Sequence, residues 1–278
     1  MGILDAIILG IIEGITEFLP VSSTAHLTIA EKVLGYSINS ADITAFTAII
    51  QIGAILATLL YFRKDLWQIV TGWIAGMLDS KKRTTKDYRF GWAVIIGSIP
   101  IGIIGLLFKD QIEHNLRSLW LVGIALIAWS GVMWLADKTA KQTRHEANVT
   151  WKDTLIIGAT QCLALIPGVS RSGATMSAGL FRGLDRVTVT RLSFFLSIPA
   201  LLAAGLLETV SKSGDISAGV GWGPTIVATV ISFIVAYLSI GWLLKFIAKH
   251  TYSVFIAYRL VLGVILLVLL AAGTISAT

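Results

Sequence analysis

Charged residues are scarce in this chain, and cysteine is almost absent. Only 14% of the 278 residues are charged, whereas a soluble domain carries about 25%, and the mean hydropathy is +0.82. The shortage of charge excludes an ordinary soluble domain, and the single cysteine, Cys162, excludes an internal disulfide. Because Cys162 lies among apolar residues, we interpret it as a small core residue. The composition predicts an integral membrane protein.

Long apolar runs take the place of the missing charge. Six of them approach the ~20 residues that a helix needs to cross a bilayer, at roughly 44–62, 92–108, 119–136, 192–207, 225–244 and 254–272. We therefore predict an all-α integral membrane protein with six transmembrane helices in a single membrane domain, 1–278. The run at the amino terminus has no basic region and is interrupted by acids, so we expect no cleavable signal peptide.

The basic residues follow the predicted membrane topology. The net charge is +6, but Lys and Arg lie in short segments between the apolar runs, so we expect no nucleic-acid partner. Of these residues, 16 fall in 63–91, 137–152, 182–191 and 245–252, and the opposite side carries Lys32, Lys109, Arg117 and Lys212. The positive-inside rule places the first set in the cytoplasm and both termini outside.

Two shorter segments each contain a break at proline. Residues 3–19 would form a helix of about 25 Å, and the helix that starts at Ser22 would measure about 18 Å, too short to cross a bilayer. Pro20 ends the first helix, and Ser22 or Ser23 can cap the next. We predict a re-entrant helical hairpin over 3–34.

A second hairpin is predicted over 153–182, with its break at Pro167 and Gly168. A shift of 148 residues aligns the two segments without a gap, pairing Gly10 with Gly158, Glu13 with Gln161, Val21 with Val169 and Ser22 with Ser170. We therefore predict two repeats, 1–136 and 153–272, each with one hairpin and three spans. Since three spans are an odd number of crossings, the second repeat is inverted, as in transporters. The hairpin tips should then meet near the midplane and line a polar cavity.

The first hairpin collects acids, hydroxyls and an imidazole. Glu13 and Glu17 are four residues apart and share one face of a helix. Carboxylates at membrane depth need a cationic partner, and their oxygens suit Mg²⁺ or Ca²⁺. Ser23 and His26 are three apart, the spacing that a nucleophile and its proton-transfer partner would need on a short helix. The alternative is a solvated pair of acids at the hairpin mouth.

The tip of the second hairpin has the pattern of an anion site. Gly168 and Gly173 let the backbone approach a ligand, Ser170 can cap the short helix, and Arg171 falls in its first turn. Amides at a helix N-terminus together with a guanidinium bind phosphate. If both short helices start at the midplane, their positive ends converge on one anion, and a diphosphate fits this better than a neutral substrate. The alternative is an arginine that the acids of the first hairpin satisfy without a ligand.

Several other polar residues have two interpretations. Gln51 and Gln161 either line the cavity or form hydrogen bonds between helices. Arg259 either snorkels to the cytoplasmic surface or faces the cavity. The basic run at 81–86 and the two residues near it, Tyr88 and Arg89, are interpreted as a solvated cytoplasmic loop near anionic lipid.

Three motifs carry a resemblance to a known family. They read EGITEFLPVSSTAH at 13–26, PGVSRSGAT at 167–175 and FIAYR at 255–259. At these residues the chain resembles the bacterial undecaprenyl-pyrophosphate phosphatase family, the bacitracin-resistance type. The resemblance covers the whole chain in length and order, although Ala25 stands where many members carry glycine.

The resemblance implies a function and a set of site residues. It implies hydrolysis of the C55 polyprenyl diphosphate to the monophosphate and inorganic phosphate in the bacterial cell membrane, which recycles the lipid carrier of cell-wall synthesis. It also implies resistance to bacitracin, which binds the same substrate, dependence on a divalent cation, Mg²⁺ or Ca²⁺, and a homodimer. The family's functional positions fall on Glu13, Glu17, Ser23, His26, Ser170, Arg171 and Thr175. We assign catalysis to Glu17, Ser23, His26 and Arg171, substrate binding to Ser22, Gly168, Ser170, Ser172, Gly173 and Thr175, and metal binding to Glu13 and Glu17.

The sequence leaves the nucleophile and one competing function open. Ser23 is the preferred nucleophile, with Glu17 or His26 taking its proton, and attack by His26 or by water is the alternative. A secondary transporter or flippase of an anionic lipid is the competing function, because inverted repeats and broken helices are transporter devices. An intramembrane protease would use the acids and hydroxyls, but the Ser-Arg turn at 170–171 has no purpose in it.

Overall fold

The computed structural model describes residues 1–108 and 118–277, and the regular elements in this part are helices, joined by one isolated β-bridge between Arg144 and Leu184. Lys109 and Arg117, which enter the charge count above, lie outside the described residues. The elements in chain order are α1 (Ile3–Thr16), α2 (Ser23–Val33), α3 (Ala41–Tyr61), α4 (Arg63–Leu78), η1 (Ser80–Thr84), α5 (Lys86–Leu107), α7 (Leu119–Thr139), η2 (Glu146–Asn148), α8 (Trp151–Gln161), η3 (Cys162–Leu165), α9 (Arg171–Phe181), α10 (Arg186–Ser211), α11 (Ser213–Ala218), α12 (Trp222–Ile247) and α13 (Ser253–Ala271).

Six of these helices are long and apolar enough to cross a membrane, and each matches one of the six predicted apolar runs, three of them ending one residue short of it. They are α3, α5, α7, α10, α12 and α13, with 19 to 26 residues each. Each helix extends up to six residues beyond its run at one end or both, because polar residues such as Lys86 and Arg186 still fit the first turn of a helix. The prediction of an all-helical membrane protein with six spans is confirmed.

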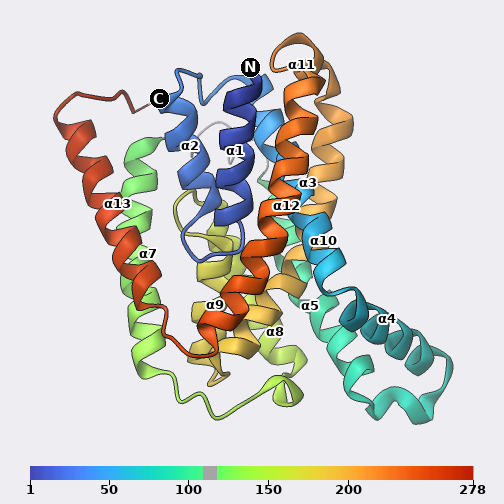
Figure 1. Cartoon of the computed structure of the whole chain (residues 1–278). Helices are drawn as coiled ribbons and strands as arrows, with labels where there is room; N and C mark the ends of the chain where they lie inside the picture. Colours follow the sequence, from blue (N-terminus) through green and yellow to red (C-terminus); the bar gives the residue numbers. More distant parts are fainter. Residues whose placement is uncertain (109–117, 278) are drawn as a thin grey trace.

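The two predicted hairpins are pairs of helices that enter the molecule from opposite ends. Figure 1 shows α1 and α2 running from the end that holds both termini to the middle, while α8 and α9 start at the opposite end. Gly10 and Gly158 allow the long arms to lie close to α12 and α5, since an added Cβ would come within 2.6 Å of the Ala228 carbonyl and 1.9 Å of the Gly97 carbonyl. The re-entrant placement in a bilayer and the inverted repeat stay predictions.

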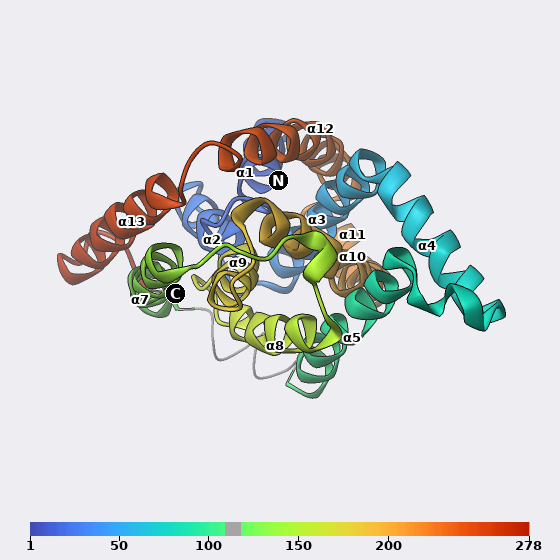
Figure 2. The same ribbon diagram turned by 90° about the horizontal axis from the view of Figure 1, so that it is seen from below.

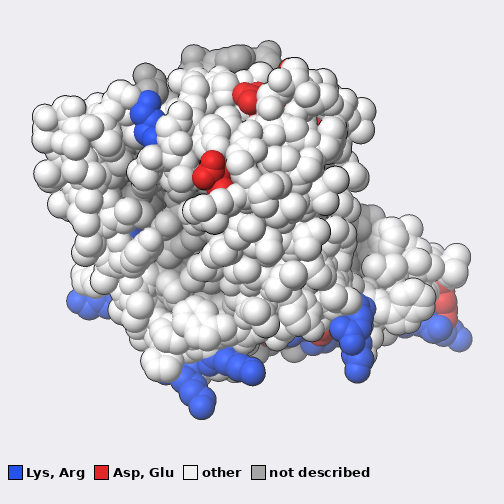
Figure 3. Space-filling view, turned by 45° about the horizontal axis from the view of Figure 1, so that its top comes forward, with Lys and Arg blue, Asp and Glu red and all other residues white. Residues whose placement is uncertain are grey.

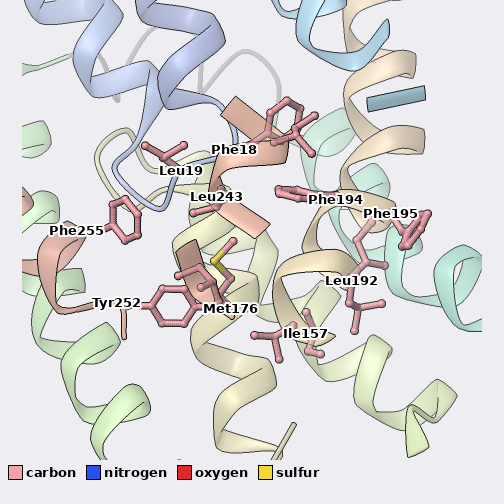
Figure 4. Close-up of a cluster of buried hydrophobic side chains, with 14 of the residues drawn as sticks. Phe18, Leu19, Ile157, Met176, Leu192, Phe194, Phe195, Leu243, Tyr252 and Phe255 are labelled. Carbon is pink, nitrogen blue, oxygen red and sulfur yellow. The ribbon is translucent and has the colours of Figure 1, made fainter. Parts of the chain in front are cut away.

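The apolar core holds the tip of the first hairpin against the spans. Phe18 meets Phe194 of α10 edge to face, with ring centroids 5.1 Å apart, and Leu19 is also buried (Figure 4). On its other side the core reaches Met176 of α9 and Leu243 of α12. Offset and edge-to-face aromatic pairs add specific geometry to the burial of apolar surface. The core therefore fixes the residues on either side of Phe18 relative to α9 and α10.

The open end of the second hairpin is closed by a buried acid. Asp153 of α8 accepts hydrogen bonds from Arg144 at 2.6 and 3.0 Å, from the Thr150 hydroxyl at 2.7 Å, and from Arg182, just after α9, at 2.9 Å. Burial would raise the pKa of Asp153, but the hydrogen bonds from Arg144, Thr150 and Arg182 outweigh it and hold that pKa well below its usual range. This network ties both arms of the hairpin to the loop before it.

The segment expected to be a loop at 63–91 is helical. It forms α4, η1 and the start of α5, and together these elements project sideways from the body (Figures 1 and 2). The physical reason is a helical apolar pattern in α4: Leu66, Ile69 and Trp73 are spaced by three and four residues and are partly buried. Residues 63–89 are called the arm below.

Candidate active site

A cavity of about 430 Å³ lies where the two hairpin tips meet α3, α5 and α10. Its polar wall comes from both hairpins and includes Glu17, Ser22, Ser23, Ser170 and Arg171. Its apolar wall comes from one side of α5, at 101–106, and of α10, at 199–207. Five of the predicted site residues, from segments about 150 positions apart in the sequence, are therefore brought together.

Ser23 and Glu17 form the shortest polar contact in the cavity wall. Ser23 Oγ donates to Glu17 Oε2 at 2.6 Å, and both residues are buried. Local structure fixes the pair: the Glu17 N–H donates to the Glu13 carbonyl at the end of α1, and Ser23 is the first residue of α2. A hydroxyl whose proton is already directed at a carboxylate is poised to become a nucleophile.

Arg171 supplies a buried positive charge beside this pair. Its Nη2 lies 3.4 Å from both Glu17 Oε1 and the Glu17 carbonyl, and its Nη1 donates to the Ser193 carbonyl at 3.0 Å. Its Nε is buried and has no hydrogen-bond partner among the described residues. Buried donors are normally satisfied, so this unpartnered N–H is an exception, and the residue itself lines the cavity. Phe18 lies under the guanidinium, with the ring centroid 5.9 Å from Cζ.

Ser22 and Ser170 begin the two short helices in the same unusual way. Their φ angles are 76° and 77°, a region that favours glycine, and Ser22 accepts from the Ala25 N–H while Ser170 accepts from the Gly173 N–H. Such outliers are concentrated at functional sites. The first turns of α2 and α9 thus both begin at the cavity wall, as expected for an anion site made from two helix N-termini.

Glu13 is fully buried next to this charge cluster but does not line the cavity. Neither of its carboxylate oxygens has a hydrogen-bond partner among the described residues. Two unpartnered carboxylate oxygens at this depth suit a cation. The described residues contain no group of three or more His, Cys, Asp and Glu with metal-ligand geometry, so Glu13 and Glu17 would supply part of a coordination shell.

His26 lies outside the cavity wall. Its Nδ1 bonds the Ser22 carbonyl at 2.8 Å, so Nδ1 carries the proton, and its Nε2 lies 2.6 Å from the hydroxyl of Tyr258, which donates to it in the neutral imidazole. The two rings are stacked at 5.5 Å. In this arrangement the imidazole supports the Ser22 turn, and the hydroxyl of Ser23 donates its hydrogen bond to Glu17 instead.

Three further predicted residues join elements behind the cavity. Ser172 Oγ donates to the Leu19 carbonyl at 2.9 Å and links the two tips, and Thr175 Oγ1 donates to Ser193 Oγ at 2.7 Å and links α9 to α10. Gly168 has a φ of 99° and packs against α7, where an added Cβ would lie 2.6 Å from the Val122 carbonyl. Their contacts position the site, and they do not line the cavity.

Arg259 is completely buried, so the interpretation that it snorkels to the surface is wrong. Its guanidinium donates to the carbonyls of Gly168 at 2.8 Å, Val169 at 3.2 Å and Pro20 at 3.4 Å, and to Ser130 Oγ at 3.2 Å. It also does not line the cavity. One side chain of α13 thus holds both hairpin tips, a role with no local signal in the sequence.

Four further polar residues line the cavity, three on spans and one at the end of α8. Gln51 and Gln161 line the cavity, as one of their two interpretations required, and Ser98 and Glu208 join them. Ser98 and Glu208 escaped sequence analysis because a single polar residue in an apolar helix has no spacing partner. The alignment of the two hairpins did identify Gln161 as the counterpart of Glu13.

Comparison with known proteins gives a consistent match. The family model described as bacitracin resistance protein BacA matches residues 6–265. The chain is 66% identical to undecaprenyl-diphosphatase 3 of Frankia casuarinae and 56% identical to undecaprenyl-diphosphatase of Cutibacterium acnes, in both cases over all of both chains. It is also 51% identical to undecaprenyl-diphosphatase 1 of Streptomyces avermitilis over 98% of each chain. With two hairpin motifs in one cavity and this match over nearly its whole length, the chain belongs to the bacitracin resistance protein BacA family.

Proposed function

We propose that the protein is an undecaprenyl-diphosphatase, a multi-pass membrane hydrolase that converts the C55 polyprenyl diphosphate to the monophosphate and inorganic phosphate. The observation that carries the proposal is the Ser23–Glu17 hydrogen bond beside Arg171 in one buried cavity. The relatives named undecaprenyl-diphosphatase support the same reaction. Removal of the diphosphate that bacitracin binds would confer resistance, and regeneration of the monophosphate would return the lipid carrier to cell-wall synthesis.

Ser23 attacks the terminal phosphorus, and Glu17 takes its proton. The new bond joins Ser23 Oγ to that phosphorus, and the bond to the bridging oxygen breaks, so that undecaprenyl phosphate leaves with the bond's electron pair. Glu17 passes this proton to the departing monophosphate and can then take a proton from the water that attacks the phosphoserine. Ser23 Oγ leaves, recovers a proton from Glu17, and inorganic phosphate is released. Direct attack by water activated by Glu17 is the alternative that the same geometry serves.

The second hairpin and the helix ends stabilise the charge on the phosphoryl oxygens. Arg171 lines the cavity, and the first turns of α2 and α9 begin at its wall. In phosphoryl transfer, positioning and electrostatic stabilisation supply most of the catalysis. Their effect is larger in a water-poor cavity than at a surface.

A divalent cation, Mg²⁺ or Ca²⁺, fits the acids of the first hairpin. Glu13 and Glu17 would hold it, since Mg²⁺ commonly takes one or two carboxylates and completes its shell with water and phosphate oxygens. When bound, it would neutralise negative charge on the diphosphate.

The apolar wall of the cavity indicates where the lipid tail lies and from which side it arrives. The wall residues at 101–106 and 199–207 belong to the halves of α5 and α10 nearer the two termini. The positive-inside count places this end outside the cytoplasm. We therefore place the first isoprene units of the substrate between α5 and α10. We also propose that the diphosphate enters the cavity from the extracytoplasmic leaflet of the bacterial plasma membrane. A homodimer remains part of the proposal.

The test measures phosphate released from undecaprenyl diphosphate by the purified, lipid-reconstituted protein, with Mg²⁺ or Ca²⁺ against EDTA. We expect turnover that needs the cation and is lost in Arg171→Ala, but is kept in Arg63→Ala, whose side chain is exposed. Fast quench should trap phosphate on Ser23. Absence of any release from folded protein would favour the transporter or flippase alternative.

A further inference from the structure

The arm, residues 63–89, projects from the body of the molecule, and near its start Leu66 and Ile69 pack against the core. Its main helix, α4, has 16 residues, about 24 Å at 1.5 Å per residue, so it is too short to cross a bilayer. Its inner face packs closely on α5, where an added Cβ on Gly76 would meet the Tyr88 ring at 2.2 Å. Trp73 and Trp92 also meet edge to face at 5.6 Å. The arm is therefore a defined structure rather than a solvated loop.

The outer face of α4 is apolar and exposed. Trp67 is 72% exposed and Leu78 is 85% exposed, and Val70, Ile74 and Met77 between them are each nearly half exposed. These positions are spaced by three and four residues and form one stripe along the helix. An exposed stripe of this kind, with a tryptophan at one end, is typical of a helix that lies in the membrane interface.

Basic residues flank the stripe at both ends. The arm carries seven Lys and Arg against three Asp, and it lies at the end of the molecule opposite the termini (Figure 1). Figure 3 shows basic side chains along this lower edge, including the projecting arm. Lys86 pairs with Glu146 at 2.8 Å, but Lys81, Lys82 and Arg83 are exposed and have no acidic partner among the described residues.

We propose that the arm is a binding site for anionic phospholipid of the cytoplasmic leaflet. The stripe of Trp67, Val70, Ile74, Met77 and Leu78 enters the acyl region, and the basic tip, Lys81, Lys82 and Arg83, binds phosphate headgroups. Charge complementarity selects this occupant: a second copy of the chain would bring the same positive tip against its own, whereas the anionic leaflet attracts it. This lipid site is separate from the cavity, so the proposal does not depend on which reaction the cavity performs.

The first test compares lipid retention by two variants that lose the same charge. One combines Lys81→Gln, Lys82→Gln and Arg83→Gln, and the control combines Lys138→Gln, Lys141→Gln and Lys249→Gln, which are exposed at the same end of the molecule. Native mass spectrometry counts the phosphatidylglycerol and phosphatidylcholine retained after detergent extraction. In the arm variant we expect the ratio of retained phosphatidylglycerol to phosphatidylcholine to fall by about fivefold per removed charge. The control should keep the ratio of the unmodified protein. Equal losses in both variants would overturn the proposal, because the effect would then be general electrostatics.

The second test measures the depth of the stripe. In a chain with Cys162→Ala, a fluorophore is placed at Met77→Cys or, as the control, at Lys82→Cys, and the protein is reconstituted with lipids brominated on their acyl chains. We expect strong quenching at position 77 and little at position 82. Absence of quenching at 77, or formation of a disulfide between two copies through Met77→Cys, would overturn the proposal, the latter by showing that a second copy covers this face.

Discussion

In the first hairpin a short helix follows Ser22 at a φ of 76°, and in the second a short helix follows Ser170 at a φ of 77°. Both open ends are closed by an acid at aligned positions, since Asp5 accepts from Tyr36 just after α2 and Asp153 accepts from Arg182 just after α9. The backbone plan of the two segments is therefore the same from mouth to tip. The inverted repeat itself stays a prediction.

The chemistry of the two hairpins differs at the aligned tips. Where the first hairpin has Glu13 and Ser23, the second has Gln161 and Arg171. The first hairpin thus supplies negative charge and a hydroxyl that faces a base, and the second supplies positive charge and amide donors. Two hairpins of similar backbone plan thus form two unlike halves of one site, and each half can be tested separately.

The largest expected effect separates the hydroxyls of the two tips. Ser23→Ala should lower kcat by at least about 10³-fold, because it removes the proposed nucleophile that faces Glu17. Ser172→Ala removes a hydroxyl from the second tip, which bonds the Leu19 carbonyl, and should lower kcat by less than about tenfold. Phosphate release by both variants in the same lipid mixture is the measurement. Equal losses would contradict the division of roles.

The next prediction concerns the arginine that holds both tips. Arg259→Gln should lower the free energy of unfolding by about 2–4 kcal/mol, because charge-assisted hydrogen bonds to several buried carbonyls are lost. The guanidinium is closer to Gly168, at 2.8 Å, than to Pro20, at 3.4 Å. Amide hydrogen exchange should therefore rise more at 168–173 than at 20–25.

Arg259→Lys is the matched control, since it keeps the charge but loses the planar fork. It should restore only part of the protection from exchange. Full restoration would mean that the charge alone, and not the set of hydrogen bonds, holds the tips.

A pH dependence is expected for the second hairpin. Because the pKa of Asp153 is held below its unfolded value, its contribution to stability is fully present above about pH 4 and is lost as the pH falls through the folded pKa. Asp153→Asn should lower the free energy of unfolding by about 2–3 kcal/mol at neutral pH and reduce the acid sensitivity. Thermal unfolding from pH 7 to pH 2 measures both, because the loss begins near pH 4 and grows as the pH falls further. Asp5→Asn should lower the free energy of unfolding by less than Asp153→Asn, since Asp5 accepts from the neutral hydroxyl of Tyr36 and not from two arginines.

Sequence alone predicted the six spans, both breaks and the five polar residues that meet in the cavity. These follow from local signals: apolar length, proline, capping serines and motif spacing. The contacts of Arg259, Tyr258 and Ser130 could not be predicted, because each depends on which spans become neighbours. The prediction of a loop at 63–91 is wrong, because its basic run is typical of a solvated loop while the apolar period of α4 favours a helix.

The smallest expected effect tests whether the two strained turns are equivalent. Glycine adopts a positive φ without strain, and it replaces a serine cap at a cost of a few tenths of a kcal/mol, whereas the strain at each serine is about 1 kcal/mol or more. Ser22→Gly and Ser170→Gly should therefore each leave stability unchanged or raise it by up to about 1 kcal/mol, while kcat/KM falls because both hydroxyls line the cavity. Thermal unfolding and phosphate release measured on the same preparations check the two parts. If only Ser170→Gly loses activity, the hydroxyl of Ser22 has a structural role only. The anion would then be bound by the second hairpin without a contribution from Ser22.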